Sequence, residues 1–278
     1  MKLRRIDSEL VRRELARSRA QAQEMIQAGR VRLDGEVVLK PARQMDPAQA
    51  IVIAQAEDEE YVSRGARKLA GALDALGDAA PLVEGRRCLD AGASTGGFTD
   101  VLLRRGAASV VAVDVGYGQL AWKLQADPRV EVRDRTNVRT MKKGDVDPVP
   151  SLVVGDMSFI SLTLVIPALV AVAEEGADFL LMVKPQFEIG KERLGRGGVV
   201  RNPDHHVETV EAVARCALDN GLAIAAVEAS PLPGPSGNVE YFLHMRAGHP
   251  HAIAPDDLHS RIVDAVRRGP AGTGEEAR

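Results

Sequence analysis

Aromatic side chains are scarce in this sequence: tryptophan, tyrosine and phenylalanine together make up 3% of its 278 residues. The interior must therefore be aliphatic, and alanine, valine and leucine occupy most of the periodic apolar positions. Hydrophobic residues still reach 45% and charged residues 27%, values that are typical of a globular protein. The length allows two domains.

Cysteines and long apolar runs are also rare. Cys88 and Cys216 lie far apart in apolar segments, which excludes a disulfide framework and the close cysteine spacing of a metal site. The longest apolar runs are too short or too interrupted to cross a bilayer, and a charged segment stands where an export signal would have its apolar core. We therefore expect a cytoplasmic protein with neither a metal nor a membrane partner.

The net charge is only −3, which excludes a uniformly basic surface but leaves room for a basic patch. Residues 1–55 carry such a basic patch. They are predicted to form an α+β unit with helices at 8–15 and 20–28 and a hairpin at 31–39. Ser18 is placed as the N-cap of the second helix, and Gly29 ends it. The basic residues singled out in this patch are Arg4, Arg5, Arg17, Arg19, Arg30 and Lys40.

The pattern of this unit resembles the ribosomal S-four-type RNA-binding domain. Ile6 and Asp34 replace the usual leucine and asparagine. The resemblance implies RNA binding, for which arginines on helices and a hairpin are well suited. For any single arginine, a solvated charged surface is the alternative. The residues that carry the resemblance are Arg5-Ile6-Asp7, Ser18-Arg19, Ala22, Ile26, Gly29, Val31, Asp34-Gly35 and Lys40-Pro41.

An acidic run at 56–63 is predicted to link this unit to a second domain at 64–246. There, short apolar strands alternate with helical patterns, which indicates a parallel α/β sheet. Residues 247–278 are expected to form a short helix at 255–268 and a disordered tail. Strands are predicted at 88–89, 109–114, 130–132, 151–156, 179–184, 222–229 and 239–245, and helices at 63–76, from Phe98, at 160–174 and at 204–220.

A glycine-rich stretch follows the first strand of this domain. Glycines let a ligand approach bare backbone, and the helix N-terminus behind them offers free N–H groups at the carboxyl edge of the sheet. Ser94 breaks the dinucleotide fingerprint, and Phe98 stands where a P-loop has lysine. A tight turn without a ligand is the alternative. The spacing Asp90-x-Gly92-x-x-x-Gly96-Gly97 instead resembles motif I of S-adenosylmethionine-dependent methyltransferases.

This resemblance implies S-adenosylmethionine as the cofactor. Asp114 ends the second strand, where a carboxylate can hold ribose hydroxyls or simply cap the strand. Asp134, just beyond the third strand, is expected to face the adenine. The cofactor-binding candidates in the loop are Asp90, Gly92, Ser94, Thr95, Gly96, Gly97 and Phe98.

Four charged residues are predicted to meet beside this loop. Asp156 and Lys184 end neighbouring strands at the same edge of the sheet. Unrelated surface ion pairs are the alternative. With Lys68 and Glu240 they match the Lys-Asp-Lys-Glu set of the FtsJ-like ribose 2′-O-methyltransferases, and the motif order over residues 1–246 resembles the TlyA family.

The family resemblance implies a Rossmann-like class I methyltransferase with a mostly parallel seven-stranded sheet. It further implies methyl transfer to a ribose 2′-hydroxyl of ribosomal RNA, with cytidine as the nucleotide and ribosomal subunits as partners. The hydroxyl must lose its proton as it attacks the methyl carbon. Lys184, held by Asp156 and Glu240 near Lys68, is the candidate that either takes this proton or, as an ammonium, orients the hydroxyl and stabilises the oxyanion.

A basic, glycine-rich segment at 187–202 is expected to be a mobile loop that closes over RNA through Lys191, Arg193 and Arg196. A disordered surface loop is the alternative. Two other functions stay open for the whole chain: a membrane-active haemolysin, a name that TlyA-like proteins have carried, and a non-catalytic ribosome-assembly factor. The first lacks an export signal or spanning segment, and the intact charged set argues against the second.

Overall fold

The computed structural model describes residues 3–16, 18–53, 61–234 and 236–273, apart from the side chains of Arg196 and Thr273. The chain divides into two compact units, Met1–Glu60 and Tyr61–Arg278. Arg17 and most of the predicted linker at 56–63 lie outside the described residues.

The small unit packs two helices against two short antiparallel sheets. The Oγ of Ser18 accepts a hydrogen bond from the Gln21 amide at 3.2 Å, so the predicted cap is confirmed. Gly29 follows the helix with a φ of 70°, as a terminating glycine does. The elements are α1 (Ile6–Arg12), α2 (Arg19–Gln27), a sheet of β3 (Glu36–Val37), β2 (Val31–Leu33) and β5 (Ile51–Ile53), and a pair of β1 (Arg4–Arg5) with β4 (Gln44–Met45).

Two buried carboxylates organise the arginines of this unit. Asp7 forms ion pairs with Arg5 at 2.7 Å and with Arg19 at 3.1 Å. Glu9 binds both Arg12 and Arg13, at 2.6 and 2.9 Å. The guanidinium of Arg5 holds the pKa of Asp7 well below its usual range, and that of Arg12 lowers the pKa of Glu9 to about 2. Both carboxylates are therefore ionised and hold the arginine side chains in place.

The large unit is built on a seven-stranded sheet in the order β11-β12-β10-β9-β6-β7-β8. β12 runs antiparallel to both of its neighbours, and the other described pairings are parallel. The prediction of a mostly parallel seven-stranded sheet is thus confirmed. The strands are β6 (Arg87–Ala91), β7 (Ser109–Val113), β8 (Val130–Arg133), β9 (Leu152–Gly155), β10 (Asp178–Val183), β11 (Ala223–Ala229) and β12 (Tyr241–Arg246).

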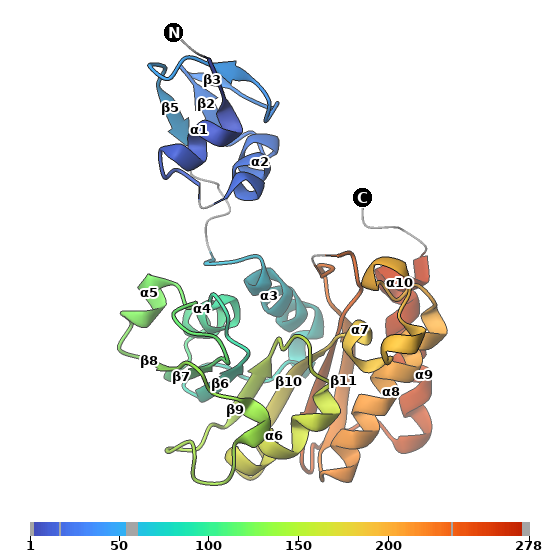
Figure 1. The fold of residues 1–278 in the computed structure, drawn as a ribbon. Helices are drawn as coiled ribbons and strands as arrows, with labels where there is room; N and C mark the ends of the chain where they lie inside the picture. Colours follow the sequence, from blue (N-terminus) through green and yellow to red (C-terminus); the bar gives the residue numbers. More distant parts are fainter. Residues whose placement is uncertain (1–2, 17, 54–60, 235, 274–278) are drawn as a thin grey trace. The chain divides into compact units, whose positions relative to one another are not determined.

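Helices cover both faces of this sheet (Figure 1). Successive strand residues alternate between two apolar clusters, because their side chains point to opposite faces. One cluster includes α3 (Gly65–Leu76) and α4 (Gly97–Arg104), and the other includes α6 (Ile166–Val172), α8 (Pro203–Asp219) and α9 (Pro255–Arg268). The shorter elements are α5 (Trp122–Gln125), α7 (Pro185–Glu188), α10 (Pro270–Thr273), and the 3₁₀ turns η1 (Gly77–Ala79), η2 (Val138–Thr140), η3 (Leu162–Leu164), η4 (Lys191–Arg193) and η5 (Arg196–Gly198).

Several boundaries differ from the sequence pattern. The helix expected at 160–174 is split into η3 and α6, because a proline occupies the first turn of α6. The tail expected to be disordered contains α10, and residues 274–278 lie outside the described part. The segment 187–202 includes the end of α7 and two 3₁₀ turns rather than one continuous loop. Within the described residues, no helix has the length and apolar character needed to cross a membrane.

Candidate active site

The loop between β6 and α4 is shaped by glycines that a side chain would not fit. Gly92 has a φ of 83°, and a Cβ there would lie 3.1 Å from the Cγ of Met157. Gly96 has a φ of 94°, and its Cβ would lie only 2.8 Å from the Cδ1 of Leu120, with Leu124 closer still. These glycines therefore let the loop pack tightly against β9 on one side and α5 on the other.

Asp90, at the end of β6, fixes the first turn of α4 through hydrogen bonds to Thr99. Its Oδ2 accepts hydrogen bonds from the amide of Thr99 at 2.9 Å and from the Thr99 hydroxyl at 2.7 Å. Its Oδ1 is buried with no hydrogen-bond partner among the described residues, and Asp90 lines a cavity. Burial raises the pKa of Asp90 to about 7. The free oxygen is thus placed to receive a donor from a ligand.

Two adjoining cavities, of about 440 and 480 Å³, lie along the carboxyl edge of the sheet. Their shared lining residues are Gly92, Ser94, Asp156 and Ser158. The first cavity is also lined by the predicted residues Lys68, Asp90, Thr95, Gly97, Phe98 and Lys184, and the second by Asp114. The edge predicted from the strand order is therefore where the hollows occur.

Two predicted cofactor residues lie outside both linings. Gly96 faces α5, so its part is to seat the loop rather than to touch a ligand. Asp134 accepts a hydrogen bond from the Gly118 amide at 2.8 Å and fixes a neighbouring turn instead of facing a cavity. The second cavity is lined instead by Asn137 and Arg139 just beyond it, which the sequence pattern did not single out.

Asp114 joins two loops at the end of β7. Its Oδ2 accepts a hydrogen bond from the Ser94 amide at 2.8 Å, and its Oδ1 accepts one from the Gly116 amide at 2.7 Å. The carboxylate stands half-buried in the second cavity, where each oxygen keeps a further lone pair for a hydroxyl. Gln119, on the following turn, also lines this cavity.

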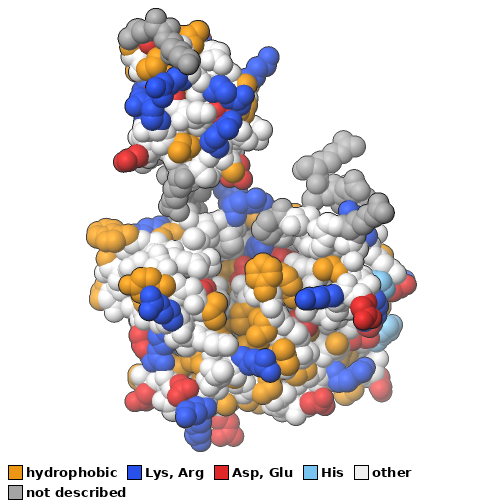
Figure 2. All heavy atoms as spheres, viewed as in Figure 1, with side chains coloured by type: hydrophobic (Ala, Val, Ile, Leu, Met, Phe, Trp, Pro, Cys, Tyr) orange, Lys and Arg blue, Asp and Glu red, His pale blue; other side chains and the backbone are white. Residues whose placement is uncertain are grey.

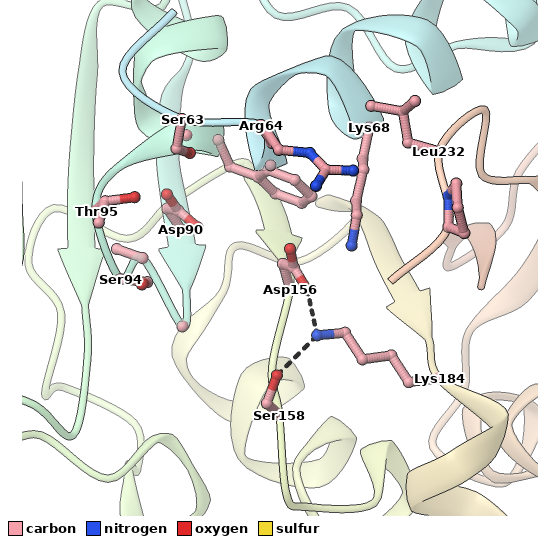
Figure 3. Close-up of a pocket in the computed structure, with 16 residues that line it drawn as sticks. Ser63, Arg64, Lys68, Asp90, Ser94, Thr95, Asp156, Ser158, Lys184 and Leu232 are labelled. Carbon is pink, nitrogen blue, oxygen red and sulfur yellow. Dashed lines mark hydrogen bonds and ion pairs between the residues drawn. The ribbon is translucent and has the colours of Figure 1, made fainter. Parts of the chain in front are cut away.

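The four charged residues come together as two ion pairs. In Figure 3, the Lys184 ammonium meets Asp156 Oδ1 at 2.5 Å and the Ser158 hydroxyl at 2.8 Å. Lys68, from α3, points toward the same space and binds Glu240 Oε2 at 2.5 Å. The expectation that Glu240 also holds Lys184 is therefore not met, since Glu240 pairs with the other lysine. Ser158 is not among the predicted residues, although it stands two positions after Asp156 in the sequence.

The predicted RNA contacts fall in both units. In the small unit, Arg4 and Lys40 are exposed, and Arg19 is exposed while paired with Asp7. Figure 2 shows many lysine and arginine side chains on the visible face of this unit. In the large unit, Lys191 and Arg193 belong to η4. Arg193 also pairs with Glu208. The remaining predicted contacts are Arg5, paired with Asp7; Arg30, which precedes β2; Arg196, whose side chain is not described; and Arg17, outside the described residues.

Comparisons with known proteins bear on this site. An FtsJ-like methyltransferase model matches residues 61–247, and an S4 domain model matches residues 4–51. The 16S/23S rRNA (cytidine-2′-O)-methyltransferase TlyA of Mycobacterium tuberculosis is 54% identical over 266 residues, which cover 96% of this chain and 98% of the relative. This chain belongs to the TlyA family of FtsJ-like methyltransferases.

Two further comparisons extend the likeness. Hemolysin A of Brachyspira hyodysenteriae is 36% identical over 82% of this chain and 93% of its own length. A solved structure from Streptococcus thermophilus, described as a hemolysin, is 36% identical, covers 99% of this chain and all of its own, and has a TM-score of 0.74. Family membership confirms the predicted enzyme class, a methyltransferase that uses S-adenosylmethionine, and the N-terminal S4 domain.

The hydrogen-bond acceptors at the carboxyl edge fit this cofactor. Asp90 leaves one buried oxygen unpartnered beside the first cavity, which suits the ammonium of the cofactor's amino-acid end. Asp114 in the second cavity suits ribose hydroxyls. The lack of a side chain at Gly92, which lines both cavities, leaves room for the part of the molecule that joins these two ends.

Proposed function

We propose that this protein transfers the methyl group of S-adenosylmethionine to the 2′-hydroxyl of cytidine in ribosomal RNA. The observation that carries the proposal is the Lys184–Asp156 pair at the edge of the first cavity, beside the glycine loop. The relative from Mycobacterium tuberculosis is named for this reaction on 16S and 23S rRNA, and that from Campylobacter jejuni for 23S rRNA. A ribosomal substrate also implies that the protein acts in the cytoplasm.

In this proposal, the bound cofactor supplies an electrophilic methyl group on a sulfonium. Asp114 and the second cavity hold its nucleoside end, and Asp90 its amino-acid end. The first cavity then receives the ribose, with the 2′-hydroxyl against the Lys184 ammonium. Fixing the hydroxyl in line with the methyl carbon supplies much of the rate, because the reacting atoms no longer have to find each other.

The ion pair favours one of the two roles considered for Lys184. The Lys184 nitrogen lies 2.5 Å from an Asp156 carboxylate oxygen, an ion-pair distance, and donates a hydrogen bond to the Ser158 hydroxyl at 2.8 Å. We therefore assign Lys184 to orienting the hydroxyl and stabilising the developing oxyanion. The proton that the hydroxyl loses passes directly to the Asp156 carboxylate, which lines both cavities and is therefore open to the ribose.

A labelled-methyl assay on ribosomal RNA tests the proposal. Wild-type protein should yield labelled 2′-O-methylcytidine on nucleoside mass spectrometry. Lys184→Ala should lower turnover by roughly 100-fold or more, while calorimetry finds little change in S-adenosylmethionine affinity. Lys143→Ala, at an exposed lysine, is the matched control. Label on a base, or wild-type turnover in Lys184→Ala, would contradict the proposal.

A further inference from the structure

A cluster of three potential metal ligands lies at the edge of the sheet opposite the active site. Asp178 begins β10, whereas Lys184 follows the end of the same strand. Six residues of extended chain separate the two by about 20 Å. His244 is on β12, two positions before Arg246, the residue paired with Asp178, and His249 is in the turn that follows. One ligand atom from each of the three residues lies within 4.8 Å of the others.

The ring of His244 lies between two oxygen acceptors. Its Nδ1 is 2.8 Å from the carbonyl oxygen of Ala79, so this nitrogen carries a proton and donates it. Its Nε2 is 3.0 Å from Asp178 Oδ1. Two acceptors at this distance require either a second ring proton or a metal ion. Both groups are almost fully buried, which keeps water from separating them.

The outer hydrogen bonds are those that usually support metal ligands. A ligating histidine commonly donates its other ring N–H to a backbone carbonyl, as His244 does to Ala79. A ligating carboxylate is commonly held through its second oxygen, and Arg86 holds Asp178 Oδ2 at 2.6 Å. Asp178 Oδ1 and His244 Nε2 thus face the cluster already oriented.

We propose that Asp178, His244 and His249 form a site for a divalent transition-metal ion, Zn²⁺ in the first place. Two imidazoles and one carboxylate are ligands that zinc accepts. The 3.0 Å between Nε2 and Oδ1 is close to the roughly 3.4 Å expected between neighbouring ligand atoms around tetrahedral zinc. His249 is half-buried in the turn after β12 and offers a ring nitrogen within 4.8 Å of the other two ligand atoms.

Three features oppose the metal and limit its affinity. Arg86 and Arg246 place positive charge 2.6 and 4.0 Å from Asp178 Oδ2. His249 accepts a hydrogen bond from the His251 amide through its Nδ1, and ligation through Nε2 gives up this bond, because the ring proton must move to Nδ1. We therefore expect micromolar rather than picomolar binding. The ion would tie the turn after β12 to β10 and, through Ala79, to the end of α3.

Zinc titration of the full-length protein, first stripped with a chelator, tests the site. Calorimetry should find one Zn²⁺ per chain with a micromolar Kd, and the thermal transition should rise as zinc exceeds that Kd. Cobalt should give the visible bands of a tetrahedral site. His249→Ala, in the turn, should weaken binding at least tenfold without changing the melting temperature of the metal-free protein.

The control is His259→Ala, at an exposed histidine on α9 that pairs with Glu211. It should bind zinc as the wild type does. A wild-type protein without stoichiometric zinc binding, or equal affinity in the wild type and His249→Ala, would overturn the proposal. In that case the His244 imidazolium is the cation between the two acceptors. The outcome is independent of methyl transfer, so it does not bear on the proposed function.

Discussion

At the scale of single residues, the candidate active site contains two buried lysines, each with its own carboxylate. Lys68 and Glu240 are both more than nine-tenths buried and form a closed pair. Lys184 is as buried as Lys68, but its partner Asp156 is only half-buried and lines both cavities. Asp156 can therefore meet a substrate, whereas Glu240 lines neither cavity and ties Lys68, on α3, to the start of β12.

Removing the carboxylate of the closed pair should destabilise the large unit. Glu240→Gln leaves the Lys68 ammonium buried without a counter-charge, which typically costs about 3–5 kcal/mol. Calorimetry should show a clearly lower melting temperature for the large unit. The control is Glu208→Gln, which breaks an exposed ion pair with Arg193 and should change the transition little. Equal shifts in the two variants would show that burial of the pair is not what matters.

Asp90 should make the folded protein less stable as the pH rises. Its pKa is about 7 in the folded state and 3.8 in the reference state, so the folded state holds the extra proton between these values. The free energy of unfolding therefore falls from about pH 4 to pH 7. Asp90→Asn keeps an oxygen for Thr99 and has no charge to bury, so it should remove this part of the pH dependence. Denaturant unfolding at pH 5 and pH 7.5 measures it. A wild-type slope that persists in Asp90→Asn would contradict the assignment.

At the scale of elements, the sequence pattern predicted at which edge of the sheet the four charged residues lie. It did not predict which lysine pairs with which carboxylate. Asp156 and Lys184 end adjacent parallel strands, so alternating strands and helices suffice to bring them together. Lys68 and Glu240 are 172 residues apart, and their pairing depends on β12 inserting antiparallel between β10 and β11. No local periodicity encodes that insertion. Strands of two or three residues, such as β1 and β5, are likewise too short to show alternation.

The contact between the glycine loop and α5 should depend on Gly96. In Gly96→Ala, the new Cβ would meet Leu120 and Leu124 at a backbone conformation that already disfavours a side chain. The variant should lose more than about 1 kcal/mol of stability, because strain and overpacking add. It should also bind S-adenosylmethionine more weakly, since the loop must shift. Thermal unfolding and calorimetric titration measure the two effects.

Gly118→Ala separates the strain from the steric clash. Gly118 has a φ of 64°, but nothing lies within 4 Å of the position that its Cβ would take. This control carries the backbone strain alone. If Gly118→Ala destabilises the protein as much as Gly96→Ala does, packing against α5 is not the reason for the glycine.

At the scale of the whole molecule, the chain separates charge between its parts. Residues 1–55 contain eleven basic and seven acidic residues, although the complete chain has a net charge of −3. Two of those carboxylates, on Asp7 and Glu9, are buried beneath the arginines that they bind. The surface of the small unit is consequently more basic than its composition, which suits the S4 domain to a polyanion.

This separation predicts that the small unit sets affinity for RNA and leaves the chemical step to the large unit. Lys40 is exposed near the β2–β3 hairpin, and Lys40→Ala should raise KM for ribosomal RNA several-fold with kcat unchanged. If Lys40 neutralises one phosphate, the slope of log affinity against log salt should also fall by about 1. Arg261→Ala, at an exposed arginine on α9, should change neither quantity. A loss in kcat at saturating RNA would instead mean that the small unit takes part in assembling the active site, because uniform binding alone cannot lower turnover.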